Sequence, residues 1–207
     1  MVLAKEPRPG FSKTRLTPPL TPGQACMLAT AALQDTIDAV LQVGATRNIL
    51  CLEGTPPPWL PASLEVIPQQ GHGLAQRLEA AFDDVGCPAF LVAMDTPQVT
   101  ALHLAEALDL LAAGAGSTIG LTDDGGYWGI GFSRPIKGAF SGVPMSSSST
   151  GQAQIARLSE LGKTPRLLPS LRDVDQIEDA LAVASGAPHT HFAGRLRSLM
   201  HTPVTTG

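Results

Sequence analysis

The sequence predicts an α/β fold in which helices cover a mostly parallel sheet. Short apolar segments alternate with segments of helical periodicity along most of the 207 residues, as in strand–helix–strand units with right-handed crossovers. The apolar run 89–94 is unbroken, which is typical of a central strand buried on both faces. No internal repeat or linker divides the chain, so we expect one domain over residues 1–207.

Seven segments have the apolar character of strands, and five others have the periodicity of helices. Strands are expected at residues 2–4, 48–52, 64–67, 89–94, 117–121, 127–132 and 166–168. Helices are expected to begin at residues 21, 74, 100, 151 and 175. Thr21 followed by Gln24 predicts a capping box for the first helix, and Thr100 predicts the cap of the third. The chain beyond Gly186 has too weak a pattern to assign an element.

Composition and charge narrow the classes of function. Hydrophobic residues make up 43% and charged residues 15%, which excludes a disordered chain. No apolar run approaches the roughly 18 residues of a membrane span, and the N-terminus lacks the apolar core of a signal peptide. A net charge of −4 argues against a nucleic-acid groove but allows small phosphorylated ligands. The three cysteines lack metal-type spacing, so we expect reduced core residues in a cytoplasmic protein.

Polar residues gather in the loops that follow the predicted strands. In an open α/β sheet, ligands bind beyond the carboxyl ends of the strands. The loops at this edge are residues 5–19, 69–73, 95–100, 123–126 and 172–175. They hold most of the unusual polar residues of the chain, so we expect them to build the functional site.

The first of these loops carries cations on a stiff backbone. Four of the chain's 14 basic residues fall within it: Lys5, Arg8, Lys13 and Arg15. Pro7 and Pro9 restrict the backbone, and Gly10 permits close approach or a positive φ. Such a loop suits a polyphosphate, with lysine as a point charge and arginine as a bidentate donor. On composition alone, a solvated basic loop is an equally good interpretation.

Acidic residues in three other loops are candidate metal ligands or turn residues. Asp95 follows the best strand, where a carboxylate can bind Mg²⁺, although aspartate near proline is also a common turn residue. The stretch 124–127, Asp-Gly-Gly-Tyr, is interpreted as a hairpin turn rather than as backbone that approaches a ligand. Asp173 has no simple structural explanation, whereas Asp175 with Glu178 can cap the last helix.

No nucleophile elbow, P-loop or histidine metal pattern is present in the sequence. The serines at 146–149 are interpreted as a flexible or ligand-ordered loop rather than as a nucleophile. His72 is the one histidine near the expected functional edge.

Six stretches together resemble a bacterial family of nucleotide-sugar-transferase-like proteins with a glycosyltransferase-A fold. This family is related to the phospholactate guanylyltransferases and, more distantly, to the molybdenum-cofactor guanylyltransferases. The matching stretches are residues 4–16, 69–77, 95–97, 124–127, 142–146 and 171–175, which span nearly the whole chain. The resemblance implies a nucleotide-diphospho-sugar transferase fold, a three-layer α/β/α sandwich around a mixed, mostly parallel sheet.

The resemblance also implies roles for particular residues. Lys13 and Arg15 would face the nucleotide phosphates, and Asp95, Asp173 and Asp175 would form the metal region. Other residues expected to contact substrate are Lys5, Pro9, Gly10, Gly71, Gly73, Asp124, Gly125, Gly126, Tyr127 and Ser146. The expected metal is Mg²⁺ or Mn²⁺.

The sequence departs from the family pattern at several positions. His72 replaces a usual aspartate, Met145 replaces a common tryptophan, and the residues before Asp124 differ. The first strand is also short, so we expect either a few residues before Met1 or a divergent strand end.

We therefore expect a metal-dependent transferase that uses a nucleoside triphosphate or a nucleotide sugar and a small acceptor. Nucleotidyl transfer and glycosyl transfer both fit these residues, and the presence of a homo-oligomer stays open. The alternative is a diverged, non-catalytic nucleotide-binding or regulatory module, which the changes at His72 and Met145 favour. The retained charges at Lys13, Asp95 and Asp173 argue against that alternative.

Overall fold

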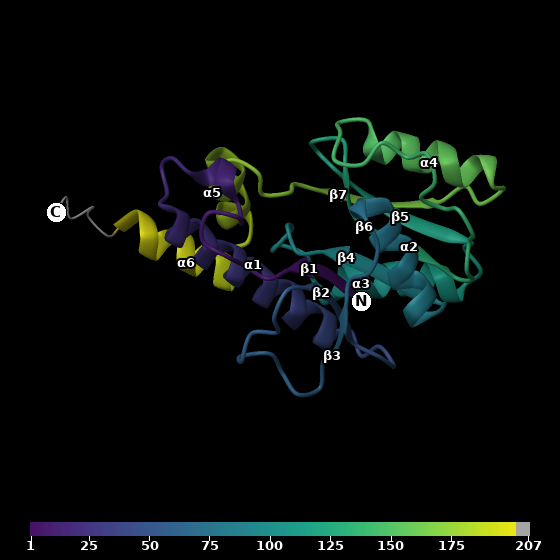
Figure 1. The fold of residues 1–207 in the computed structure, drawn as a ribbon, viewed down its shortest axis with the longest axis horizontal. Helices are drawn as coiled ribbons and strands as arrows, with labels where there is room; N and C mark the ends of the chain where they lie inside the picture. The colour runs from purple at the N-terminus through teal and green to yellow at the C-terminus, as the bar shows by residue number, and fades with distance from the viewer. Residues whose placement is uncertain (202–207) are drawn as a thin grey trace.

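A seven-stranded sheet forms the centre of the computed structural model, which describes residues 1–201 (Figure 1). Its strands are β1 (Val2–Lys5), β2 (Ile49–Glu53), β3 (Glu65–Pro68), β4 (Ala89–Ala93), β5 (Ser117–Thr122), β6 (Tyr127–Phe132) and β7 (Arg166–Leu171). They lie in the order β3-β2-β1-β4-β6-β5-β7. Neighbouring strands are parallel except that β6 is antiparallel to both β4 and β5. The prediction of a mostly parallel, mixed sheet is confirmed.

Helices cover both faces of this sheet. They are η1 (Thr14–Leu16, a 3-10 helix), α1 (Pro22–Gln42), α2 (Gly73–Val85), α3 (Ala101–Ala112), α4 (Thr150–Glu160), α5 (Ile177–Gly186) and α6 (His191–His201). Alternate residues of β4 serve two cores, because Phe90 and Val92 pack with α1 and α3 whereas Leu91 packs with α2 and α4. The predicted three-layer sandwich is therefore confirmed. Within residues 1–201, no helix has the length and apolar character needed to cross a membrane.

A third core lies beside the sheet and joins the first loop to the C-terminal helices. It contains residues of η1, α1, α5 and α6, which lie together at the left of Figure 1. Leu16, Leu28, Val174 and Phe192 in this core are each at most 1% exposed. Because Leu16 ends η1 and Val174 precedes α5, this core fixes the cation-bearing loop against the segment that carries Asp173.

The sequence pattern did not predict α6. This helix buries only Phe192, Ala193 and Leu196, and most of its other residues are polar or small. Its first N–H groups are capped by Asp35 of α1, which accepts from the backbone of His191 at 2.7 Å and of Phe192 at 2.8 Å. A cap supplied by a residue 156 positions earlier has no local sequence signature.

The helix starts predicted at residues 21 and 100 are confirmed, each with a capping box. The last predicted helix needs a correction, because α5 begins at Ile177. Gln176 is the N-cap residue, and the carboxylate of Asp179, three residues later, accepts its backbone N–H at 2.9 Å as part of a capping box. The expected capping role of Asp175 is wrong, and its carboxylate pairs with Arg15 instead.

Candidate functional site

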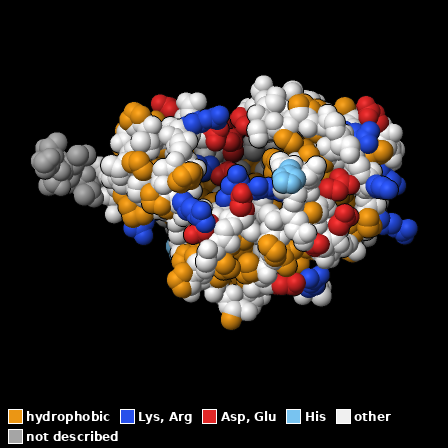
Figure 2. All heavy atoms as spheres, in the orientation of Figure 1, with side chains coloured by type: hydrophobic (Ala, Val, Ile, Leu, Met, Phe, Trp, Pro, Cys, Tyr) orange, Lys and Arg blue, Asp and Glu red, His pale blue; other side chains and the backbone are white. Residues whose placement is uncertain are grey.

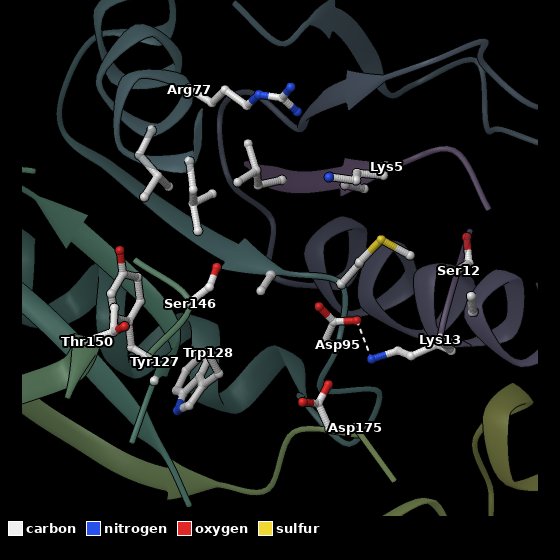
Figure 3. A pocket seen from close by; sticks show the side chains of 18 of the residues that line it. Lys5, Ser12, Lys13, Arg77, Asp95, Tyr127, Trp128, Ser146, Thr150 and Asp175 are labelled. Atoms are coloured by element: carbon white, nitrogen blue, oxygen red, sulfur yellow. Dashed lines mark ion pairs between the residues drawn. The ribbon is translucent and has the colours of Figure 1, made fainter. Parts of the chain in front are cut away.

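The loops at the carboxyl edge of the sheet enclose a cavity of about 670 Å³ (Figure 3). The predicted site residues that line it are Lys5, Lys13, Arg15, Gly73, Asp95, Asp124, Gly126, Tyr127, Ser146 and Asp175. A second hollow of about 890 Å³ shares Arg15, Asp124 and Asp175 with the first and adds Asp173. Basic and acidic side chains gather around the hollow at the centre of Figure 2. β6 contributes its first residue to this edge because it runs opposite to its neighbours.

Lys13 joins the first loop to the loop that follows β4. Its backbone is left-handed (φ 50°, ψ 43°) where η1 begins, and its side chain is 9% exposed. The ammonium Nζ lies 2.5 Å from Oδ1 of Asp95 (Figure 3) and also donates to the carbonyl of Val174. An ammonium has three N–H groups, so one N–H remains for a ligand oxygen. The structure thus brings together a cation and an acid that lie far apart in the sequence.

Arg15 and Lys5 are exposed cations of the same cavity. Arg15 lies 2.5 Å from the carboxylate of Asp175, and its side chain is 71% exposed. Lys5 lies 3.4 Å from Glu53, and its side chain is 74% exposed. Exposed ion pairs of this kind typically contribute about 0.2–1 kcal/mol to stability. Both cations can therefore turn toward a bound anion at small cost in free energy.

Three carboxylates converge beside these cations. One oxygen from each of Asp124, Asp173 and Asp175 lies within 4.8 Å of the other two. Oδ1 of Asp124 is fixed, because it accepts from the hydroxyl of Thr122 at 2.6 Å and the N–H of Gly126 at 2.8 Å. Burial, and next the charge of Asp124 and of Asp175, raises the pKa of Asp173 to about 6. A divalent cation would neutralise this repulsion, and Mg²⁺ and Mn²⁺ both prefer carboxylate oxygens.

The structure places Asp95 beside Lys13 rather than within the group of three carboxylates found in residues 1–201. Its role as a metal ligand stays a prediction. Pro9, Gly10, Gly71 and Gly125 are not among the residues that line the two hollows. Gly71 instead has a backbone reason to be glycine, because its φ is +101° and a Cβ there would lie 2.7 Å from Cβ of Gln76.

The paired glycines form the turn between β5 and β6, so the hairpin interpretation is confirmed. Gly125 has φ +89°, and a Cβ there would lie 1.9 Å from the carbonyl oxygen of Ser148. The N–H of Gly151 at the start of α4 donates to the carbonyl of Gly125 at 2.8 Å. The backbone that this turn approaches closely is therefore the serine-rich loop. This contact holds Asp124 and Ser146 on adjoining parts of the cavity wall.

Sequence reasoning missed a polar network at the other end of the cavity (Figure 3, Arg77). The guanidinium of Arg77 pairs with Glu53 and also donates to the side-chain oxygen of Gln69 at 3.3 Å. The amide nitrogen of Gln69 donates to the carbonyls of Ala4 at 2.7 Å and Cys51 at 3.0 Å. The network ties α2 to the ends of β1 and β2. Its partners come from separate segments, so spacing along the chain does not reveal it.

Tyr127 lines the cavity with its ring, but its hydroxyl is buried without a hydrogen-bond partner among residues 1–201. Burial raises the pKa of this phenol far above its usual value. An unpaired buried hydroxyl costs about 1–3 kcal/mol, so Tyr127→Phe is expected to leave stability unchanged or to increase it by about 1 kcal/mol. Chemical denaturation measures this change. A clear loss of stability would show that the hydroxyl has a partner in solution.

The comparisons with known proteins agree with this architecture. None of the curated proteins that were compared matches the chain. Among solved structures, a protein of Desulfovibrio desulfuricans G20, provisionally described as a nucleotide-diphospho-sugar transferase, is 24% identical with a TM-score of 0.86. That match covers 95% of this chain and 92% of the other.

Two further structures are more distant. Rv0371c of Mycobacterium tuberculosis H37Rv, in complex with manganese, is 23% identical with a TM-score of 0.53, over 89% of this chain and 95% of the other. The 2-C-methyl-D-erythritol 4-phosphate cytidylyltransferase of Thermus thermophilus is 14% identical with a TM-score of 0.56, over 90% of this chain and 98% of the other. At these identities, the similarity establishes the nucleotide-diphospho-sugar transferase fold.

The family of the chain follows from the sequence itself. The model of DUF2064, described as an uncharacterized protein conserved in bacteria, matches residues 27–147, which is more than half of the chain. This range includes β4 and the loop at Asp95, as well as the turn at Asp124. The chain therefore belongs to the DUF2064 family of bacterial proteins, and it has the fold of the nucleotide-diphospho-sugar transferases.

Proposed function

We propose that the protein is a metal-dependent transferase that binds a nucleoside triphosphate or a nucleotide sugar in the cavity and transfers part of it to a small acceptor. The observation that carries this proposal is the pairing of Lys13 with Asp95 and of Arg15 with Asp175 at one cavity. Separate cations and acids gathered in this way suit a ligand that combines polyphosphate with a divalent cation.

The cations have distinct roles in this proposal. Arg15 and Lys5, which are mostly exposed, turn from their acidic partners toward phosphate oxygens. Lys13 keeps its contact with Asp95 and uses its remaining N–H for the phosphates. Holding the phosphates at fixed donors positions the reacting group and neutralises its charge, which supplies most of the catalysis in such transfers.

The acids fit a divalent cation. Asp124, Asp173 and Asp175 would hold it, and Asp95 lies on the neighbouring loop as the other candidate ligand. A Mg²⁺ or Mn²⁺ ion bound there would supply charge neutralisation at phosphoryl oxygens, including those of a departing pyrophosphate or nucleoside diphosphate. The manganese complex of Rv0371c supports a divalent cation, and the cytidylyltransferase of Thermus thermophilus supports a nucleotide substrate, for this fold.

Thermal unfolding with a panel of nucleoside triphosphates and nucleotide sugars, each with and without Mn²⁺, tests the proposal. A ligand at about 100 times its dissociation constant stabilises a protein by about 2.7 kcal/mol, which is a rise in Tm of roughly 5–10 °C for a chain of this size. We expect at least one Mn²⁺–nucleotide pair to give this rise. If no ligand of the panel raises Tm, the proposal is wrong.

Product analysis with the best ligand then distinguishes the reactions. Release of pyrophosphate indicates nucleotidyl transfer, whereas release of a nucleoside diphosphate indicates glycosyl transfer. Binding without turnover for any acceptor tested would favour the non-catalytic module.

A further inference from the structure

Residues 172–175, here called the clasp, lie between β7 and α5 and contact the loop that begins at Asp95. The clasp is held there by three hydrogen bonds. The side-chain amide of Gln98 donates to the carbonyl of Arg172 at 2.5 Å, and the N–H of Val174 donates to the carbonyl of Asp95 at 3.0 Å. The ammonium of Lys13 donates to the carbonyl of Val174. The clasp thus contacts both segments that carry the Lys13–Asp95 pair.

The side chains of the clasp point to two different environments. Val174 is fully buried in the core that α1, α5 and α6 form with η1. Leu28 and Phe192 belong to the same core. Its neighbours Asp173 and Asp175 are only partly buried and place their carboxylates in the acidic group with Asp124. Because Val174 lies between the two acids, the packing of its side chain into the core orients both carboxylates toward Asp124.

The acidic group needs such an anchor because its members repel one another. One carboxylate oxygen of Asp173 lies within 4.8 Å of an oxygen of Asp124 and of Asp175, and the Asp173 side chain is only partly exposed to water. Without such an anchor, electrostatic repulsion would separate the carboxylates of this segment and expose them to water. The burial of Val174 and its two backbone hydrogen bonds oppose this movement.

We propose that Val174 is the positioning residue of the metal site, which holds Asp173 and Asp175 in a geometry that can bind a divalent cation. The inference rests on the proposed function in one respect, namely that the acidic group takes such a cation. It adds that α5 and α6 belong to the site, because they form the core into which Val174 packs. A site built on a buried anchor is more precise than one built on a free loop.

The test compares Val174→Ala with Val183→Ala in the full chain. Both changes remove the same atoms from the same core, where the two valines are 0% and 5% exposed, but Val183 lies within α5 and outside the clasp. The dissociation constant for Mn²⁺ alone is measured from the electron paramagnetic resonance signal of the free ion. Tm is measured in parallel on the same samples.

We expect both variants to lose thermal stability, and Val174→Ala to raise the dissociation constant for Mn²⁺ at least about tenfold, as loss of a residue that orients a ligand does. Val183→Ala should change this constant less than about twofold. Equal dissociation constants for Mn²⁺ in the two variants would overturn the inference about Val174 and leave the proposed function intact. Absence of Mn²⁺ binding by the wild type would overturn both.

If Val174→Ala does not fold, Val174→Thr and Val183→Thr replace the first pair, because threonine fills the volume of valine while its hydroxyl disfavours burial in an apolar core. The same difference in Mn²⁺ affinity is expected. Equal affinity in this second pair would likewise overturn the inference.

Discussion

Gly125→Ala is expected to lower the free energy of unfolding by at least about 3 kcal/mol. A Cβ at this position would lie 1.9 Å from the carbonyl oxygen of Ser148 and 2.6 Å from its carbonyl carbon, so backbone would have to move. The residue also has φ +89°, which alone costs an L-residue about 1–2 kcal/mol. Because Tm falls by about 2–4 °C per kcal/mol in a chain of this size, we expect a fall of roughly 6–12 °C.

Gly142→Ala is the matched control for this substitution. Its φ of +76° is similar, but a Cβ there would meet no atom within 4 Å. Only the conformational strain remains, so we expect a loss of about 1–2 kcal/mol. Denaturant unfolding of the two variants separates the free-energy cost of the steric clash from the cost of the strained backbone conformation. Equal losses would mean that the hairpin and the serine-rich loop do not pack together as the structure has them.

Asp173→Asn is expected to change metal affinity and stability in opposite directions. In the proposed function Asp173 is a metal ligand, so replacing its charge by a neutral amide should weaken Mn²⁺ binding by about 100-fold or more, since even residues that only orient ligands are worth about 10–100-fold. The metal-free protein should become more stable at pH 7.5. The pKa of Asp173 is raised from its usual 3.8 to about 6, so its charged form destabilises the fold above that pH.

The expected gain in stability is on the order of 1 kcal/mol, because Asp173 is only partly buried and solvent screens part of the repulsion. Asp109→Asn, on the exposed side of α3, is the control and should change neither quantity. Calorimetric titration with Mn²⁺ and denaturant unfolding measure the two effects. A loss of stability together with unchanged Mn²⁺ affinity would show that Asp173 has a purely structural role.

The elements with local signals could be predicted from the sequence. The alternation of strands and helices indicated the sandwich, and Thr21 and Thr100 marked two helix starts because a capping box lies within four residues. α6 could not be predicted, because its cap is Asp35 of a distant helix. The start of α5 was misplaced, because both Glu178 and Asp179 follow Asp175 and only the structure shows which carboxylate turns back to the backbone.

The candidate site could be predicted from the sequence only in part. The rule that ligands bind at the carboxyl edge selected the loops of Lys13, Asp95 and Asp124, and the structure places all three residues on one cavity wall. The grouping of Asp124 with Asp173 depends on the hairpin and the clasp meeting in space, which no spacing along the chain encodes. The assigned roles of these residues, the single domain and the cytoplasmic location stay predictions.

Calorimetric titration with the best nucleotide of the panel, with and without Mn²⁺, tests the central claim most directly. If cations from the first loop and acids from the hairpin and the clasp surround one ligand, Mn²⁺ should tighten nucleotide binding at least about tenfold, or about 1.4 kcal/mol. By reciprocity, the nucleotide should tighten Mn²⁺ binding by the same factor. Nucleotide affinity that is the same with and without the metal would contradict a shared site.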